Sequence, residues 1–344
     1  MDSQMNPYIA DLLAQPEALR ATLAGFAAPS GLRELAKGFK SGKHARLVLT
    51  GMGMSYAALH YLVFRLTQHG FCPILVETSE LIYDAASIIS EKTLLVVASQ
   101  SGQSGEIVKL LSMVSKNPVV AITNNPDSPL ARGATFAYIT QAGVEHSVPC
   151  KTYLTALAAM AAFSNDLVGV SRAKDETLIL AASSLMSAYL STWDVKAAEM
   201  AERLDGCSSM VLCGRGFSVA SAFAGAHTIR DAAKIHAEGL SAAQFRHGHM
   251  EMIGKGFAVV VFRGAESTAP LLEKLASDIQ AANGTVVVVS DQGRDGARLI
   301  PPCAPQILPF LEILPTQLAS IGLAWKHGRE PGHFATHSKV TTSE

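Results

Sequence analysis

The chain has 344 residues, of which 49% are hydrophobic and 17% are charged, and its formal net charge at pH 7 is -1. This composition excludes a disordered chain, and the length is that of two domains of about 150 residues each rather than one. The near-zero net charge also argues against a nucleic-acid-binding protein, because such a protein needs a strongly basic surface.

The first residues and the cysteines indicate a protein of a reducing compartment. Residues 1–13 (MDSQMNPYIADLL) lack the basic segment and apolar run of a signal peptide. No window reaches the about 18 consecutive apolar residues that would predict a membrane span. The five cysteines are scattered and form no CxxC pair, which argues against a disulfide framework or a structural zinc site. We therefore expect a cytoplasmic protein with reduced thiols.

From residue 45 onward, short apolar segments alternate with helix-like segments. The apolar segments are rich in Val, Ile and Leu without polar alternation, which is typical of parallel strands buried on both faces. The helix-like segments between them include residues 55–70 and 104–117. This alternation predicts a doubly wound parallel sheet. Its expected strands are residues 45–50, 73–78, 93–99, 118–123 and 136–140.

A second series of strands is expected after a helical region of roughly residues 151–204. Its expected strands are residues 208–214, 257–264, 285–291 and 306–310. The two series are related, because LVLTGMGMSYAA (47–58) aligns without a gap with MVLCGRGFSVAS (210–221). PVVAITNNPDS in the first series also resembles TVVVVSDQGR in the second. Two matches in the same order favour an internal duplication.

The clearest functional motif is SQSGQS (99–104), which follows the third expected strand and precedes a helix. Ligands of parallel sheets bind at the carboxyl ends of the strands, and a helix N-terminus offers free N–H groups to an anion. Serine side chains add donors, and Gly102 lets the backbone approach closely. The motif predicts a phosphate site, with a simple N-cap at Ser104 as the alternative. The second series has FRGAES (262–267) instead, so one phosphate site is expected.

A dinucleotide site is the alternative for the glycines that follow the first strand. Gly51 and Gly53 form G-x-G, and Glu77 ends the second expected strand. The third glycine of the dinucleotide motif is missing, because Tyr56 stands in its place, and two glycines alone are weak evidence. No cofactor is therefore expected.

The other dense motif is a run of ionisable residues between Arg230 and Glu251 in the second series. Acid–base catalysis needs a carboxylate or a histidine poised near neutral pH. The run therefore predicts acid–base chemistry, with a hydrated domain surface as the alternative. Within this run no H-x-x-x-H or H-E-x-x-H spacing occurs, so no metal site is expected.

These motifs together resemble the tandem sugar-isomerase (SIS) domain family. The resemblance is carried by GMGMSY, SQSGQS, TNNPDSPLA, AGVEHSV, IHAEGLSAAQFRHG and the terminal SKVTTSE. The family includes the isomerase half of glucosamine-6-phosphate synthase and SIS-type aminosugar-phosphate deaminases and deglycases. The resemblance implies a homodimer with a shared active site, and two flavodoxin-like α/β domains. The implied segments are an N-terminal helical segment (1–30), a first SIS domain (31–165), a helical connector (166–200), a second SIS domain (201–330) and a C-terminal tail (331–344).

The resemblance also implies roles for individual residues. The phosphate of a small sugar phosphate would be held by Ser55, Ser99, Gln100, Ser101 and Ser104. Asp231 would be the acid–base carboxylate, and Glu238 would shape the site. His247 would assist ring opening, and Lys339 in the tail would contact the carbonyl or amine end of the sugar.

Some residues depart from the family pattern. Met54 replaces a hydroxyl residue, Thr228 replaces a lysine, and His249 stands where proline is usual. Asp231 is one methylene shorter than the usual glutamate. Fewer than 45 residues precede the first expected strand, so no glutaminase domain is expected. The resemblance thus implies a phosphosugar isomerase or aminosugar-phosphate deaminase acting on a hexose- or aminohexose-6-phosphate by ring opening and C1–C2 proton transfer. A fructosamine-phosphate deglycase and a non-catalytic sugar-phosphate sensor are the alternatives.

Overall fold

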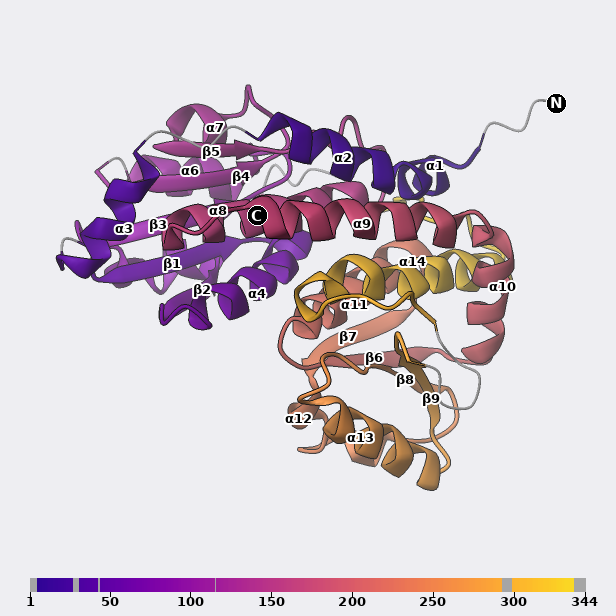
Figure 1. Ribbon diagram of the computed structural model, residues 1–344. Coiled ribbons are helices and arrows are strands. Elements are labelled where there is room, and N and C mark those ends of the chain that lie inside the picture. The colour runs from indigo at the N-terminus through magenta and orange to yellow at the C-terminus, as the bar shows by residue number, and fades with distance from the viewer. Residues whose placement is uncertain (1–4, 27–30, 43, 115, 293–298, 337–344) are drawn as a thin grey trace. The chain divides into compact units, whose positions relative to one another are not determined.

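The computed structural model describes residues 5–26, 31–42, 44–114, 116–292 and 299–336 (Figure 1). The chain forms two compact units. The β1–β5 unit comprises mainly Glu17–Glu145 and Lys151–Leu180, and the β6–β9 unit comprises the residues up to Pro16, His146–Cys150 and Ala181–Ala335. Each unit has a parallel sheet with its own hydrophobic core.

The β1–β5 unit contains a five-stranded sheet in the order β2-β1-β3-β4-β5, in which all neighbours are parallel. Its strands are β1 (Arg46–Gly51), β2 (Pro73–Glu77), β3 (Thr93–Ala98), β4 (Val119–Thr123) and β5 (Phe136–Ile139). Every residue of β3 and β4 is buried, as expected for strands covered on both faces. Val48, Leu95 and Val97 belong to a core cluster with residues of α5 and α6, while α4 packs against α8.

The helices of this unit connect the strands in sequence. They are α2 (Gln15–Gly25), α3 (Leu32–Lys40), α4 (Gly53–Thr67), α5 (Thr78–Tyr83), the short 3-10 helix η1 (Ala86–Ile88), α6 (Gly105–Met113), α7 (Pro129–Gly133) and α8 (Lys151–Val168). The next helix, α9 (Ala173–Leu190), begins in this unit and ends in the other.

The β6–β9 unit contains a four-stranded parallel sheet in the order β7-β6-β8-β9. Its strands are β6 (Ser209–Gly214), β7 (His236–Ser241), β8 (Phe257–Phe262) and β9 (Thr285–Val289). Its helices are α1 (Pro7–Leu13), α10 (Trp193–Arg203), α11 (Ser218–Ala233), α12 (Ala242–Phe245), η2 (His249–Met252), α13 (Ala269–Ala281), η3 (Pro305–Ile307) and α14 (Leu308–Lys326). The sheet lies between the α11–α14 pair and the α12–α13 pair (Figure 1).

The strand orders confirm the predicted fold class. Both sheets share the order of their first four strands, 2-1-3-4, which is the order of flavodoxin-like folds. Eight of the nine predicted strands are strands in the structure, within two residues at each end. The two sheets are therefore two copies of one doubly wound arrangement.

One predicted strand of the second sheet was wrong, and one strand of that sheet was missed. Residues 306–310 are helical rather than a strand, because QILPF, which is apolar after its first residue, continues into the long helix α14, which is buried from Leu308 to Ala324. A short apolar run does not by itself distinguish a strand from a buried helix. The strand β7 was missed because its sequence, HAEGLS, contains Gly and Glu. Gly239 is needed there, because a Cβ would lie 2.6 Å from Phe223 Cα of α11.

One segment of the described chain, Pro305–Lys326, is long and apolar enough to cross a membrane. Its most apolar window is entirely buried inside the protein, so the segment is the core helix of the β6–β9 unit.

Candidate active site

The predicted phosphate-site residues of the β1–β5 unit lie at one edge of its sheet. β1 and β3 are adjacent, and their last residues, Gly51 and Ala98, are in register. The backbones approach closely there, because a Cβ at Gly51 would lie 2.8 Å from the Ala98 carbonyl oxygen. Ser55 lies in the first turn of α4, directly after β1, and the loop 99–104 follows β3. The structure therefore brings Ser55 and the SQSGQS loop to the same edge.

The backbone of the loop 99–104 is held by internal hydrogen bonds. The Ser99 hydroxyl accepts from the Gly102 N–H at 3.1 Å. The Gln100 carbonyl accepts from the Asn124 N–H at 3.1 Å and from the Thr123 hydroxyl at 3.3 Å. Ser99 and Gln100 thus fix the shape of the loop and tie it to the end of β4.

Ser101 and Ser104 are the loop hydroxyls best placed to serve a ligand. Ser104 is the N-cap of α6, yet its side chain makes no capping hydrogen bond. The Ser101 hydroxyl has only a long contact of 3.4 Å with the Gln103 N–H. Both side chains are half-buried. Two hydroxyls beside the N-terminus of a nine-residue helix form an arrangement suited to an anion.

Tyr56 and His60 on α4 stay neutral near this edge. Burial raises the pKa of the Tyr56 phenol, and the Glu77 carboxylate raises it further. Burial also lowers the pKa of the His60 imidazole to about 4. The two rings are nearly perpendicular to each other, with centroids 5.6 Å apart. At pH 7 both side chains are therefore polar groups without charge.

The substitution Gly102→Ala is expected to disturb the loop strongly. Gly102 has a φ of +65°, and a Cβ there would lie 2.6 Å from Ser128 Cβ. Gly70→Ala is the matched control, because Gly70 has a φ of +82° but nothing within 4 Å of the added atom. The control should lower the free energy of unfolding by about 1–2 kcal/mol from backbone strain, and Gly102→Ala by about 1–3 kcal/mol more from overpacking. Urea unfolding of both variants measures this difference, and equal losses would contradict it.

The predicted acid–base carboxylate, Asp231, lies in the last turn of α11 in the β6–β9 unit. Its Oδ2 is 3.0 Å from His227 Nδ1, one helical turn earlier. Both side chains are largely buried, with 17% of Asp231 and 24% of His227 exposed. The contact is electrostatic rather than a well-aligned hydrogen bond, since His227 Nδ1 has no hydrogen-bond partner among the described residues.

Glu238 lies on β7 and contacts His249. Its Oε2 is 3.2 Å from His249 Nε2. His249 stacks on Phe245, with ring centroids 5.8 Å apart. His247 is exposed, and among the described contacts it touches neither Glu238 nor Asp231.

The predicted site residues belong to different parts of the chain. The phosphate-site residues belong to the β1–β5 unit, whereas Asp231, Glu238 and His247 belong to the β6–β9 unit. Lys339 lies outside the described residues. Among the residues that the structure describes, no group of three or more His, Cys, Asp or Glu side chains is placed to hold a metal ion.

Sequence reasoning missed both histidines that contact the predicted carboxylates. His227 stands four residues before Asp231 on a predicted helix, and this spacing places two side chains on one face. It was therefore detectable. The approach of His249 to Glu238 joins a 3-10 helix to a strand and has no such local signal.

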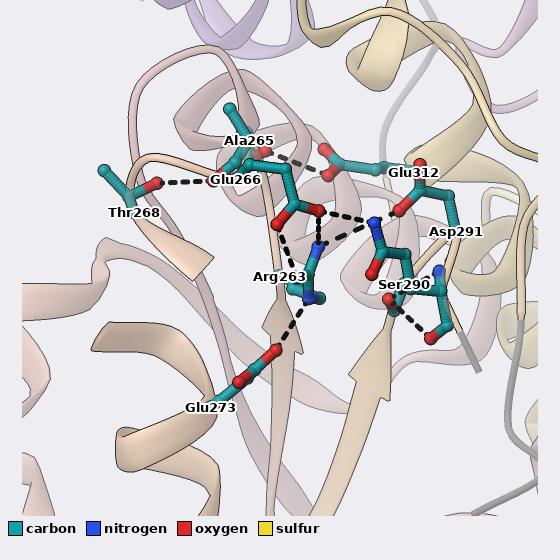
Figure 2. A network of polar contacts seen from close by, with 10 residues as sticks. Arg263, Ala265, Glu266, Thr268, Glu273, Ser290, Asp291 and Glu312 are labelled. Atoms are coloured by element: carbon teal, nitrogen blue, oxygen red, sulfur yellow. Dashed lines mark hydrogen bonds and ion pairs between the residues drawn. The ribbon is translucent and has the colours of Figure 1, made fainter. Parts of the chain in front are cut away.

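The β6–β9 unit contains a network of polar contacts at the carboxyl edge of its sheet, which Figure 2 shows. The Arg263 side chain is 8% exposed and contacts Glu266 at 2.7 Å and Glu273 at 2.8 Å. Glu312 of α14 is fully buried, and its carboxylate accepts from the Ser218 hydroxyl at 2.9 Å and the Ser221 hydroxyl at 3.0 Å.

Burial raises the pKa of the Glu312 carboxyl from 4.5 to about 7. The serine hydroxyls oppose this shift, and Asp291 adds to it. Between pH 4.5 and about pH 7 the folded protein retains on Glu312 a proton that the unfolded chain has released. Its stability therefore falls as the pH rises through this window and levels off above it.

Glu312→Gln is expected to remove this pH dependence, because glutamine does not titrate. Between pH 5 and pH 8 the wild-type protein should lose on the order of 3 kcal/mol of unfolding free energy more than the variant. Urea unfolding at both pH values measures the difference. Glu199→Gln on the exposed face of α10 is the control and should behave like wild type. Parallel pH profiles for wild type and Glu312→Gln would contradict the assignment.

Comparison with known proteins identifies relatives over most of the chain. The sequence model of the SIS domain family matches residues 41–165 and 204–323. The glutamine–fructose-6-phosphate aminotransferase (isomerizing) of Pyrococcus horikoshii is 31% identical over 317 residues, which cover 88% of this chain and 52% of the relative. The enzyme of that name from Thermococcus kodakarensis is 27% identical over 356 residues, covering 97% and 57%. The chain thus spans about half the length of these relatives.

Solved structures share the fold over nearly the whole chain. The C-terminal domain of glucosamine-fructose-6-phosphate aminotransferase from Francisella tularensis superposes with a TM-score of 0.86 at 20% identity, covering 96% of this chain and 99% of that one. Glucosamine-6-phosphate deaminase from Thermotoga maritima superposes with a TM-score of 0.78 at 16% identity, covering 98% and 100%. At these identities the likeness concerns the fold alone.

Proposed function

Because this chain belongs to the SIS domain family, we propose that it is a phosphosugar isomerase or an aminosugar-phosphate deaminase. The proposed substrate is a hexose- or aminohexose-6-phosphate. The names of the relatives support this class, since they refer to fructose-6-phosphate and glucosamine-6-phosphate. The proposed protein is a cytoplasmic homodimer.

The observation that carries the proposal is the loop 99–104. It is fixed by the side chain of Ser99 and the carbonyl of Gln100, and the hydroxyls of Ser101 and Ser104 stand beside the N-terminus of α6. Ser55 lies in the first turn of α4, at the same sheet edge. A phosphate dianion bound there would receive several hydrogen bonds from preformed donors, so little conformational entropy would be lost on binding.

In the proposed reaction, the bound sugar phosphate opens its ring with the help of His247. Asp231 then removes the proton from C2 of the open-chain aldose while the C1 carbonyl oxygen gains a proton, which gives an enediol. Return of a proton to C1 and loss of the proton from the C2 hydroxyl produces the ketose. For an amino sugar, the corresponding ketose imine is hydrolysed by water to the ketose and ammonia.

The other predicted residues have supporting roles in this proposal. Glu238 shapes the sugar site, and Lys339 contacts the carbonyl or imine end. His247 is exposed, in keeping with a side chain that serves the active site of a second subunit. Light scattering tests the dimer, and a monomer at micromolar concentration would contradict a shared site.

Incubation with a panel of sugar phosphates tests the proposed function. Glucosamine-6-phosphate, fructose-6-phosphate and fructosamine phosphates are supplied separately, and release of ammonia, amine and ketose is measured. Turnover of the first two supports the isomerase–deaminase class, whereas amine release from the fructosamine phosphates alone would favour a deglycase. No turnover and no binding across the panel would contradict the proposal.

A sugar-phosphate sensor without catalysis is the second candidate. Thr228 favours it, because this residue stands where the family resemblance implies a lysine. Its hydroxyl is fully buried without a hydrogen-bond partner among the described residues. A thermal shift with a sugar phosphate that is not turned over would support the sensor.

A further inference from the structure

The two sheets allow a residue-by-residue comparison of their loops. In the first sheet Thr50 pairs with Val97, and in the second sheet Cys213 pairs with Val261. Thr50 and Cys213 are equivalent in the alignment of 47–58 with 210–221. The loops 99–104 and 263–268 therefore start at equivalent positions. Both also end where a helix begins, at Gly105 and at Ala269, so they have the same length.

Some hydroxyls of the proposed phosphate site have a counterpart in the second sheet, and others do not. Ser218 is equivalent to Ser55, and Thr268 is equivalent to the N-cap Ser104. Ser99 and Ser101 are replaced by Arg263 and Ala265. The place in the second sheet that corresponds to the proposed phosphate site thus has fewer hydroxyls, but Ser218 and Thr268 still offer donors there.

An acidic side chain of the same chain reaches this position. Glu312 accepts hydrogen bonds from Ser218 at 2.9 Å and Ser221 at 3.0 Å, and it has a further backbone hydrogen bond at Gly264. Ser218 belongs to the first turn of α11, and Gly264 belongs to the loop after β8. These are the two elements that correspond to the proposed phosphate site of the β1–β5 unit.

We propose that the β6–β9 sheet carries a second copy of the anion site, and that the Glu312 carboxylate occupies it in place of a phosphate. The donors come from the equivalent helix and the equivalent loop, and the carboxylate is fully buried among them. Arg263 does not compete for it, because its guanidinium is engaged by Glu266 and Glu273 (Figure 2).

The occupied site ties three parts of the unit together. Glu312 comes from α14, which packs against α11, and its carboxylate joins both helices to the loop after β8. The wild-type protein should therefore take no phosphate at this position. Removing the carboxylate should leave a polar cavity that binds a small anion.

The variant Glu312→Ala tests the proposal, with inorganic phosphate and formate as probes. Melting temperatures are measured at pH 8 in either anion and in chloride of equal ionic strength. Phosphate at about 100 times its Kd should raise the melting temperature of Glu312→Ala by about 5–10 °C more than that of wild type. Formate should also raise it, because it restores the missing carboxylate. Phosphate bound at the loop 99–104 affects both proteins alike and cancels in the comparison, so the result is independent of the proposed function.

Two control variants sharpen the result. Glu312→Gln preserves the side-chain shape and leaves no cavity, so its response to phosphate should equal that of wild type. Adding Ser218→Ala to Glu312→Ala removes a donor and should abolish most of the additional shift.

Three outcomes would overturn the proposal. Equal phosphate shifts in Glu312→Ala and wild type would show that no anion site was opened. If formate stabilises Glu312→Ala and phosphate does not, the cavity is a carboxylate-binding site unrelated to the phosphate site. If Glu312→Ala is obtained unfolded, it is refolded in phosphate and in chloride; recovery in phosphate alone supports the proposal, and no recovery in phosphate contradicts it.

Discussion

Replacing Asp231 by asparagine is expected to lower kcat by about 10²–10⁴-fold, while binding of the sugar phosphate changes little. The amide has the shape of the carboxylate but cannot accept the C2 proton. The proposed phosphate contacts belong to Ser55 and to the loop 99–104, which the substitution leaves unaltered. Steady-state kinetics on the substrate found in the panel give kcat, and a thermal shift with the same compound gives binding.

Two further variants control this experiment. Asp194→Asn changes an exposed carboxylate in the first turn of α10 and should leave kcat unchanged. Asp231→Glu lengthens the side chain by the one methylene that separates it from the family pattern, and it should retain more activity than Asp231→Asn. Full activity of Asp231→Asn would show that another group moves the proton.

Removing both hydroxyls of Ser101 and Ser104 by alanine substitution is expected to raise KM at least about 100-fold with little effect on kcat. A hydrogen bond to a charged group contributes about 1.5–3 kcal/mol, and the double variant loses two of them. Because the phosphate does not react, the loss affects substrate and transition state equally, and it should appear in KM.

The matched control for the double variant lies on the same helix. Ser112→Ala removes an exposed hydroxyl near the end of α6 that donates to the Lys109 carbonyl. Its KM should equal that of wild type. An unchanged KM in the Ser101→Ala/Ser104→Ala variant would place the phosphate elsewhere.

The sequence was sufficient to predict most of the sheets because their strands are continuous apolar runs. LVLT and LLVVAS have no competing helical pattern, and the turns after them contain Gly51 and Gly102. The loop 99–104 was also identifiable, because its residues are adjacent in the sequence. β7 was missed because HAEGLS is not an apolar run. Its glycine is explained only by the close packing of Gly239 against Phe223 of α11.

The buried network of the second sheet could not be predicted from sequence. Ser218 and Glu312 are 94 residues apart, and their contact depends on how α14 packs against α11. Glu312 stands in a segment so apolar that part of it was assigned to a strand. A single carboxylate there gives no local signal of the partners that it finds.

The equal lengths of the loops 99–104 and 263–268 bear on how a fused protein can change after duplication. One half can lose its ligand through point substitutions alone, with no insertion or deletion and no shift of strand register. A side chain from a neighbouring helix then takes the place of the small molecule and links the helices to the loop. In such a protein, the half that holds its own side chain would fold without a ligand, while the other half would keep its ligand site.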